Sequence, residues 1–157
     1  MTETGKIRIA KDKAELVKSL TISGGKTGAF QTFADVVVFA ATLGAKHKKR
    51  VPLEGVSKKE PGPIRIEQFI SMGYDVVIKL LAVVETQDVE ILSPTEEELE
   101  KQRNQIFEEY ANGGLEIIQN EVLGAVDYLE RILLLLSYER TSKDRTDGEF
   151  DLTRFLP

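Results

Sequence analysis

The chain has 157 residues, of which 41% are hydrophobic, 30% are charged and none is cysteine. This length fits one compact domain. The lack of thiols excludes a disulfide-stapled secreted module, a thiolate zinc site, an iron–sulfur cluster and a cysteine nucleophile. The apolar stretches are far shorter than the roughly 20 residues that span a bilayer, and no signal-peptide pattern opens the chain. We therefore expect a cytoplasmic protein without membrane contact.

The first part of the chain predicts a strand and a helix. Residues 5–10 alternate between polar and apolar, as in a half-buried strand with Lys6 and Arg8 on one face. Helical spacing follows over residues 11–20, and a flexible glycine-rich turn over 23–28 ends this unit.

A second, largely apolar helix is predicted to begin at Phe33. Thr32 followed by Asp35 matches a capping box, which satisfies the free amides at a helix start. Gly44 marks either a close contact with another helix or the end of this one. The basic run Lys46-His47-Lys48-Lys49-Arg50 comes next and suits the negative end of a helix dipole. Residues 58–63 are predicted to form a loop.

Three shorter helices are expected in the middle of the chain. The first spans residues 66–72, and Gly73 interrupts it. The second spans 74–85, with Val77, Leu80, Leu81 and Val84 toward the core and Val76 and Val83 beside them. The third begins with Ser93 as N-cap and Pro94 in the first turn, and it runs to about Tyr110 with a charged outer face.

The longest helix is predicted over residues 115–137, after a break at Asn112-Gly113-Gly114. Its apolar residues advance by alternating steps of three and four from Leu115 to Leu136, which is the spacing of packed helices. The stretch 132–136 is apolar on all sides, so it is either buried in the monomer or part of a subunit contact. Because of the second alternative we expect a homo-oligomer, such as a dimer.

The predicted fold class is mainly α: a single helical domain of five to six helices with a short N-terminal strand, in β-α-α order, and a long C-terminal core helix. The domain spans residues 1–137, basic over 1–65 and acidic over 66–137, and residues 138–157 form a polar, turn-rich tail. Hydrophobic side chains near the end of the tail suggest that it docks, either by folding back on this domain or on another protein. These candidate protein-interaction residues are Phe150, Leu152, Phe155 and Leu156.

The sequence shows no catalytic, metal or cofactor site. Gly24-Gly25-Lys26-Thr27 is similar to the end of a phosphate-binding loop, but Leu20 stands where that loop requires a glycine, so a plain turn is favoured. The only histidine, His47, lies among lysines that repel a cation. We expect that the protein is not an enzyme and binds no metal or cofactor.

The distribution of charge predicts an anionic partner. Residues 1–65 carry thirteen Lys and Arg against six Asp and Glu, whereas residues 66–157 carry eight against twenty. The basic part either faces a polyanion or acidic protein, or is neutralised by the acidic part within the same fold. The candidate DNA-binding residues are Lys6, Arg8, Lys46, Lys48, Lys49, Arg50, Lys58 and Lys59. The alternative for the lysine run is a solvated helix end.

Four blocks of the chain resemble a known family. They are residues 6–17, residues 32–41 with Leu43-Gly44, Arg50-Val51-Pro52-Leu53 and residues 106–116. Together they are similar to the family of Dnd system-associated protein 4. The resemblance implies a bacterial accessory protein encoded near DNA phosphorothioation genes, where sulfur replaces a phosphate oxygen and companion proteins restrict unmodified DNA. It implies a genetic neighbourhood and no particular activity.

These observations favour a non-catalytic accessory or adaptor protein of a DNA phosphorothioation-linked restriction system, used in antiphage defence, which contacts DNA or partner subunits. One alternative is a ribbon-helix-helix-like transcriptional regulator of the neighbouring genes, which would need dimers and base contacts from Lys6 and Arg8. A second alternative is an enzyme with an unrecognised carboxylate site. A deep polar pocket holding a carboxylate of raised pKa would reveal such a site.

Overall fold

The structure is a computed structural model that describes residues 5–22 and 28–146. The described part holds two short strands, two 3₁₀ helices and six α-helices, so the predicted mainly α fold with a short N-terminal strand is confirmed. In chain order the elements are β1 (Lys6–Ile7), η1 (Lys11–Lys13), α1 (Ala14–Leu20), α2 (Phe33–Lys46), β2 (Ile64–Arg65), α3 (Ile66–Ser71), α4 (Asp75–Thr86), η3 (Val89–Leu92), α5 (Glu97–Val122) and α6 (Tyr128–Thr146).

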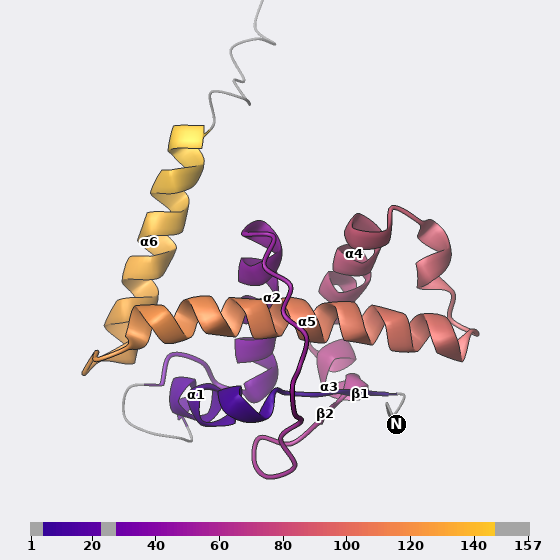
Figure 1. Cartoon of the computed structure of the whole chain (residues 1–157), viewed down its shortest axis with the longest axis horizontal. Coiled ribbons are helices and arrows are strands. Elements are labelled where there is room, and N and C mark those ends of the chain that lie inside the picture. Colours follow the sequence, from indigo (N-terminus) through magenta and orange to yellow (C-terminus); the bar gives the residue numbers. More distant parts are fainter. Residues whose placement is uncertain (1–4, 23–27, 147–157) are drawn as a thin grey trace, which may run out of the picture.

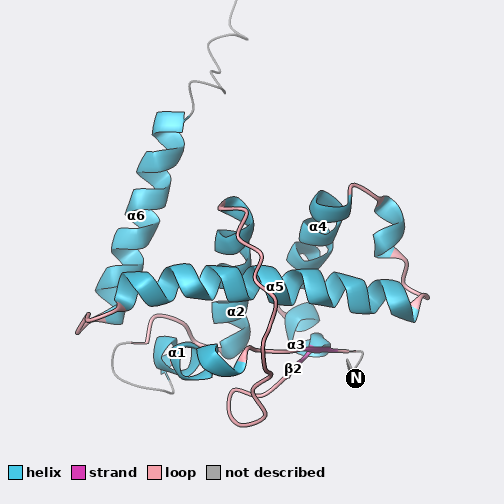
Figure 2. Ribbon diagram, in the orientation of Figure 1, coloured by secondary structure: helices cyan, strands magenta, loops and turns pink. Residues whose placement is uncertain are grey.

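Helix α5 is the axis of the molecule. It runs across the full width of the fold, and α2 crosses it near its middle (Figure 1). Helix α4 and η3 lie at one end of α5, whereas α6 rises from the other end (Figure 1). Figure 2 shows how little of the described chain is strand. None of the described helices is long and apolar enough to cross a membrane.

The crossing of α2 and α5 is built on glycine. A Cβ atom added at Gly114 would overlap the carbonyl group of Ala40, and one added at Gly44 would overlap that of Tyr110. Without side chains at these positions the two backbones approach closely. The predicted break at Asn112-Gly113-Gly114 is therefore wrong, because these glycines make room for a neighbour inside a continuous helix. For Gly44, the close-contact alternative holds.

The predicted helix over residues 115–137 is also wrong, because it is two helices. Helix α5 ends at Val122, and the chain turns at Gly124, whose φ of 76° favours glycine. Helix α6 then continues to Thr146, through residues expected to be turn-rich. The apolar residues that advance from Leu115 to Leu136 do not form one buried line, since Leu115 and Ile118 are buried whereas Leu129 and Leu136 are 44% and 45% exposed. The four tail hydrophobes lie outside the described residues, as does Gly24-Gly25-Lys26-Thr27.

The two strands form a small antiparallel sheet within the chain. Lys6 pairs with Arg65, and Ile7 pairs with Ile64. The sequence predicted only the first strand. In a ribbon-helix-helix module the partner strand comes from a second copy of the protein, whereas here β2 of the same chain takes that place. This pairing argues against the regulator alternative.

The hydrophobic core lies mainly around α2 and α5, where Val36, Val37, Phe107 and Ile118 are almost fully buried. The predicted break at Gly73 separates α3 from α4 as expected. The predicted core face of α4 is partly wrong: Ile78 and Leu81 are buried, but Val76, Leu80 and Val84 are more than half exposed. Apolar residues occur on both faces of α4, so their spacing alone does not identify the covered face.

The predicted helix starts have different outcomes. The capping box is present, since the Thr32 hydroxyl accepts from the Asp35 amide and the Asp35 carboxylate accepts from the Thr32 amide, both at 3.1 Å. The prediction for Ser93 is wrong, because α5 begins at Glu97, one turn later than Pro94.

Candidate functional site

The candidate DNA-binding residue Arg8 is held by a buried carboxylate of α5. Both oxygens of Glu108 accept from its guanidinium group, with distances of 2.8 to 3.2 Å, and the Arg8 amide donates to Glu108 Oε2 at 2.6 Å. The Glu108 side chain is only 2% exposed. Burial raises the pKa of Glu108 against the opposing effect of the Arg8 hydrogen bonds, and those bonds in turn raise the pKa of Arg8. Arg8 therefore fixes β1 to α5.

Arg50 is the centre of a second network, which is partly exposed and in which only Glu109 is buried. Its Nε donates to Glu109 Oε1 at 2.7 Å, and its Nη1 donates to Glu85 Oε1 at 2.9 Å. The Tyr110 hydroxyl donates to the other oxygen of Glu85. This hydrogen bond, followed by those from Arg50, holds the pKa of Glu85 below its ordinary value. Burial and the bond to Glu85 raise the pKa of Tyr110 to about 12. The network ties the loop after α2 to α4 and α5.

The basic run at the end of α2 holds helix α6 in place. Lys46 forms an ion pair with Glu139 and also donates to its backbone carbonyl at 3.1 Å. His47 Nε2 lies 2.5 Å from Glu139 Oε1. Burial acts to raise the pKa of Glu139, but the hydrogen bonds from Lys46 and His47 outweigh it and lower that pKa. Glu139, half-way along α6, is thus a polar contact between this helix and the rest of the fold.

Lys49 is paired with an acidic residue of α5 as well. Its ammonium group lies 3.1 Å from Glu116 Oε2. The same carboxylate is 3.9 Å from the ammonium group of Lys13, a lysine that is 98% buried and also pairs with Asp12 at 2.9 Å. Glu116 therefore forms ion pairs with lysines from two segments that are distant in the sequence.

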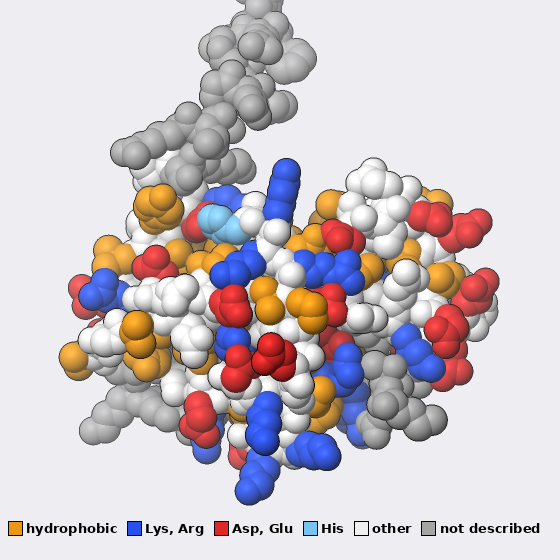
Figure 3. Space-filling model, in the orientation of Figure 1, with side chains coloured by type: hydrophobic (Ala, Val, Ile, Leu, Met, Phe, Trp, Pro, Cys, Tyr) orange, Lys and Arg blue, Asp and Glu red, His pale blue; other side chains and the backbone are white. Residues whose placement is uncertain are grey.

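The remaining candidates are not brought together. Lys48, Lys58 and Lys59 are exposed and have no ion pair within residues 5–22 and 28–141. Lys48 follows α2, whereas Lys58 and Lys59 lie in the loop before β2, and these two segments are on opposite sides of α5 (Figure 1). Lys6 is half-buried on β1. On the face shown in Figure 3 the blue and red side chains alternate and form no uniformly basic surface.

Four of the eight candidate residues are thus neutralised inside the fold, as the second interpretation of the charge distribution supposed. The sequence did not predict their partners Glu85 of α4, Glu108, Glu109 and Glu116 of α5, and Glu139 of α6. For Glu108 and Glu109 the reason is that the charges of their helix were expected on an outer face. One local signal was available: residues 109, 112 and 116 lie on one side of a helix, next to the buried residues 108 and 115.

The structure also bears on a possible carboxylate site. Glu108 is a buried carboxylate of raised pKa, but the cavity beside it has a volume of about 10 Å³, room for no more than one water molecule. Both of its oxygens are engaged by Arg8. Among the described residues, no three His, Cys, Asp or Glu side chains gather in a way that could hold a metal ion.

The fold and its ion pairs define a small helical protein in which an acidic central helix neutralises much of a basic N-terminal part. The chain belongs to a family described as DNA sulphur modification system-associated protein 4, whose model matches residues 6–155. This confirms the resemblance and gives the chain an accessory role in a DNA sulphur modification system. No curated protein and no solved structure matches the chain.

Proposed function

We propose that the protein is a non-catalytic adaptor of a DNA phosphorothioation-linked restriction system, and that it binds other proteins of that system through helix α6. The family supports the accessory role. The observation that carries the proposal is the apolar surface of α6 that the described residues leave exposed. It fits an adaptor better than a DNA-binding protein, because Arg8, Lys46, Lys49 and Arg50 already have acidic partners.

Helix α6 packs on the fold by one side only. Ile132 and Leu135 are 3% exposed, whereas Leu133, Leu134 and Leu136 are 56%, 53% and 45% exposed. In Figure 1 the helix rises away from α5. Contiguous exposed apolar side chains on a protein surface mark a site of protein association. The leucine face of α6, defined here as Leu133, Leu134 and Leu136, is therefore the proposed docking surface for a partner subunit.

The non-catalytic part of the proposal rests on the surroundings of Glu108. A catalytic carboxylate must reach a substrate atom, but this one is enclosed and hydrogen-bonded on both oxygens. A structural role in holding β1 against α5 accounts for its burial and its raised pKa.

Direct DNA contact is the second candidate function. It is favoured by the exposure of Lys48, Lys58 and Lys59, which have no acidic partner in the described part of the chain. Such isolated lysines can supply phosphate contacts, which give affinity that depends on salt and not on sequence.

Co-purification tests the adaptor. The purified protein is used to capture, one at a time, the gene products encoded beside it in a DNA sulphur modification cluster. We expect one of them to bind, and the double variant Leu133→Gln/Leu136→Gln to lose it. Leu80→Gln on α4, where Leu80 is equally exposed, is the matched control. Binding that both variants retain would overturn the assignment to α6.

Fluorescence anisotropy tests DNA contact separately. Modified and unmodified duplexes are titrated with the protein at low and high salt. If the lysines bind phosphates, affinity falls with salt, and the triple variant Lys48→Glu/Lys58→Glu/Lys59→Glu reduces the slope. No binding at low salt leaves the adaptor as the proposed function. Sedimentation of the same α6 variants tests whether a second copy of the chain is the partner.

A further inference from the structure

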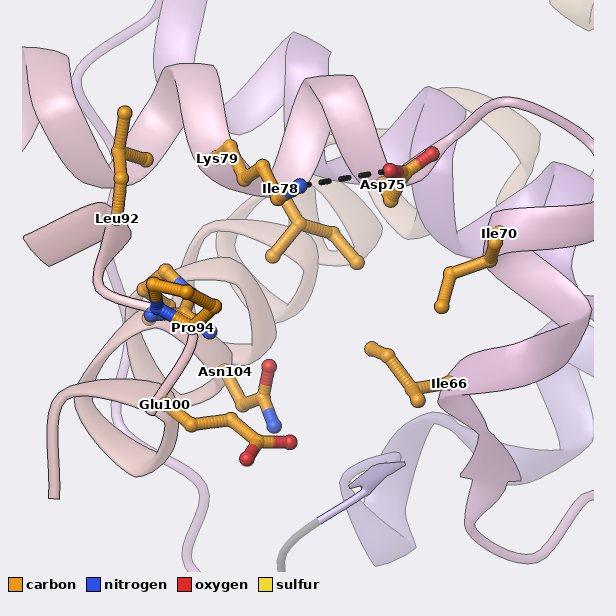
Figure 4. A pocket seen from close by; sticks show the side chains of 10 residues that line it. Ile66, Ile70, Asp75, Ile78, Lys79, Leu92, Pro94, Glu100 and Asn104 are labelled. Carbon is orange, nitrogen blue, oxygen red and sulfur yellow. Dashed lines mark ion pairs between the residues drawn. The ribbon is translucent and has the colours of Figure 1, made fainter. Parts of the chain in front are cut away.

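A pocket lies at the opposite end of α5 from α6. It has a volume of about 250 Å³ and opens between α3, α4, α5 and the segment after η3 (Figure 4). Its lining divides into apolar walls and a polar floor and rim. The walls are Ile66, Ile70, Ile78, Leu92 and Pro94, and the polar residues are Asp75, Lys79, Glu100, Arg103 and Asn104.

Asn104 is the unusual group in this pocket. The residue is only 6% exposed, and its side chain makes no hydrogen bond within the described part of the chain. Figure 4 shows its amide pointing into the space between Ile66 and Ile78. A polar side chain in so enclosed a position nearly always has a hydrogen-bond partner, and this amide faces the pocket, from which a ligand can supply one. An amide carries both donors and an acceptor, so another amide group satisfies it.

The charges around the pocket leave a negative group without a partner. Lys79 pairs with Asp75 at 3.6 Å. Arg103 donates to the carbonyl oxygens of Ile91 and Ser93 at 2.7 and 2.9 Å, so it holds the segment after η3 in place. Glu100 has no ion pair among the described residues and lines the same pocket one helical turn before Asn104. A cation on the ligand would complement this carboxylate.

The size of the pocket restricts the class of ligand. Sites for cofactors and drug-sized molecules have volumes of about 300 to 1,000 Å³, and this pocket is smaller. It has room for one aliphatic side chain and the peptide group attached to it. The unpartnered amide, the apolar walls and the free carboxylate lie within one pocket and so specify three parts of the same ligand.

We propose that this pocket binds a short peptide segment of a partner protein, in which an aliphatic residue is followed by Arg or Lys. The aliphatic side chain packs against Ile66 and Ile78, the peptide group pairs with the Asn104 amide, and the cationic group reaches Glu100. The identity of the partner rests on the proposed adaptor function. The pocket and its ligand chemistry do not, because they are tested without any partner protein.

The test is a titration of isotope-labelled protein with N-acetyl-Leu-Arg-amide, followed by NMR. We expect saturable shifts of the amide signals of Ile66, Ile78 and Asn104. Asn104→Leu should bind about tenfold more weakly or not at all, because it removes the amide pairing. Asn120→Leu, on the exposed side of the same helix, should change neither binding nor the shifts.

Two further titrations test the class of ligand. N-acetyl-Leu-Glu-amide should bind more weakly than the Arg probe, and Glu100→Gln should remove that preference, whereas Glu98→Gln on the exposed side should keep it. Equal binding of the two probes would overturn the proposal that a cationic group of the ligand reaches Glu100. The absence of saturable shifts, or binding that Asn104→Leu leaves unchanged, would overturn the site. Saturation by adenosine and not by the dipeptide would assign the pocket to a nucleobase instead.

These outcomes are distinguishable from failure of the adaptor. A pocket that binds the dipeptide in a protein that captures no partner leaves the pocket correct and the adaptor wrong. If the protein captures a partner through α6 and without Asn104, and binds no dipeptide, the adaptor is correct and the pocket proposal is wrong.

Discussion

Gly44 of α2 and Gly114 of α5 lie against each other where the two helices cross, so close that a Cβ atom on Gly44 would come within 2.9 Å of the Gly114 backbone nitrogen. Two glycines on different helices thus form one contact. The crossing brings the end of α2, with its basic run, next to the acidic residues of α5. The packing of the core and the ion pairs above it therefore depend on the same small area.

Gly114→Ala is expected to destabilise the protein by about 2 kcal/mol or more, because the added methyl group overlaps the Ala40 carbonyl. If the glycines merely broke a helix, alanine would instead stabilise it by up to about 1 kcal/mol through its helix propensity. Urea unfolding measures the difference in unfolding free energy between the protein and the variant. A loss of stability supports the close helix contact, and a gain supports a helix break. Asn120→Ala, on an exposed position of α5, is the control and should change stability little.

Arg8→Met is expected to cost about 3 kcal/mol or more, because it leaves the carboxylate of Glu108 buried without a cationic partner and with only the backbone amide of residue 8 as donor. Arg65→Met is the matched control: the Arg65 pair with Glu67 is 3.8 Å long and exposed, so its loss should cost less than about 1 kcal/mol. Chemical unfolding of both variants gives the comparison. Equal costs would contradict a structural role for Arg8.

The stability contributed by Tyr110 should disappear at alkaline pH. Its pKa is about 12 in the folded protein against an ordinary value of 10, so the folded state keeps a proton that the unfolded state loses. This contribution is complete below pH 10 and is lost as the pH rises to 12. The difference in unfolding free energy between the protein and Tyr110→Phe should therefore shrink over this interval. A constant difference from pH 9 to 12 would contradict the bond to Glu85.

Acid should loosen the attachment of α6. The pKa of Glu139 is lowered in the folded protein, so its contribution is present above the ordinary value of 4.5 and is lost as the pH falls through the lower folded value. The chain has no cysteine, so spin labels at Thr42→Cys and Tyr138→Cys, both exposed positions, report the distance between α2 and α6. We expect this distance distribution to broaden below pH 4.5.

The same labels provide a variant test of the attachment. Glu139→Gln should broaden the distribution already at neutral pH, because a neutral amide loses the charge that holds Lys46. Glu130→Gln, exposed on the same helix, should not. A narrow distribution in the Glu139 variant would mean that Ile132 and Leu135 alone hold α6 in place.

The parts of the fold that the sequence predicted are those set by neighbouring residues. The capping box of Thr32 and Asp35 is a local pattern, and the start of α2 was found from it. The glycines of α5 could not be assigned in this way. A glycine pair has the same local preference whether it ends a helix or admits a neighbour, and only the position of Ala40 distinguishes the two.

For the candidate site, the sequence predicted the overall distribution of charge but not the individual ion pairs. The uneven charge was visible in the composition, and internal neutralisation was one of its two interpretations. The individual pairs were not predictable, because Arg8 and Glu108 are 100 positions apart and no spacing rule connects them. The exposed leucines of α6 were also hidden in the sequence, since an all-round apolar stretch does not indicate which of its sides the fold covers.

The pairing of Arg8 with Glu108 has a consequence for the order of events during synthesis. A growing chain emerges at about 5 to 20 residues per second, so β1 and the basic run are made well before α5. Until α5 is complete, Arg8 and Lys49 lack the carboxylates of Glu108 and Glu116, and their cations are open to any polyanion nearby. The closing of contacts across 100 residues is then a late step of folding, and the same step that completes the core also withdraws the positive charge of the new chain from its surroundings.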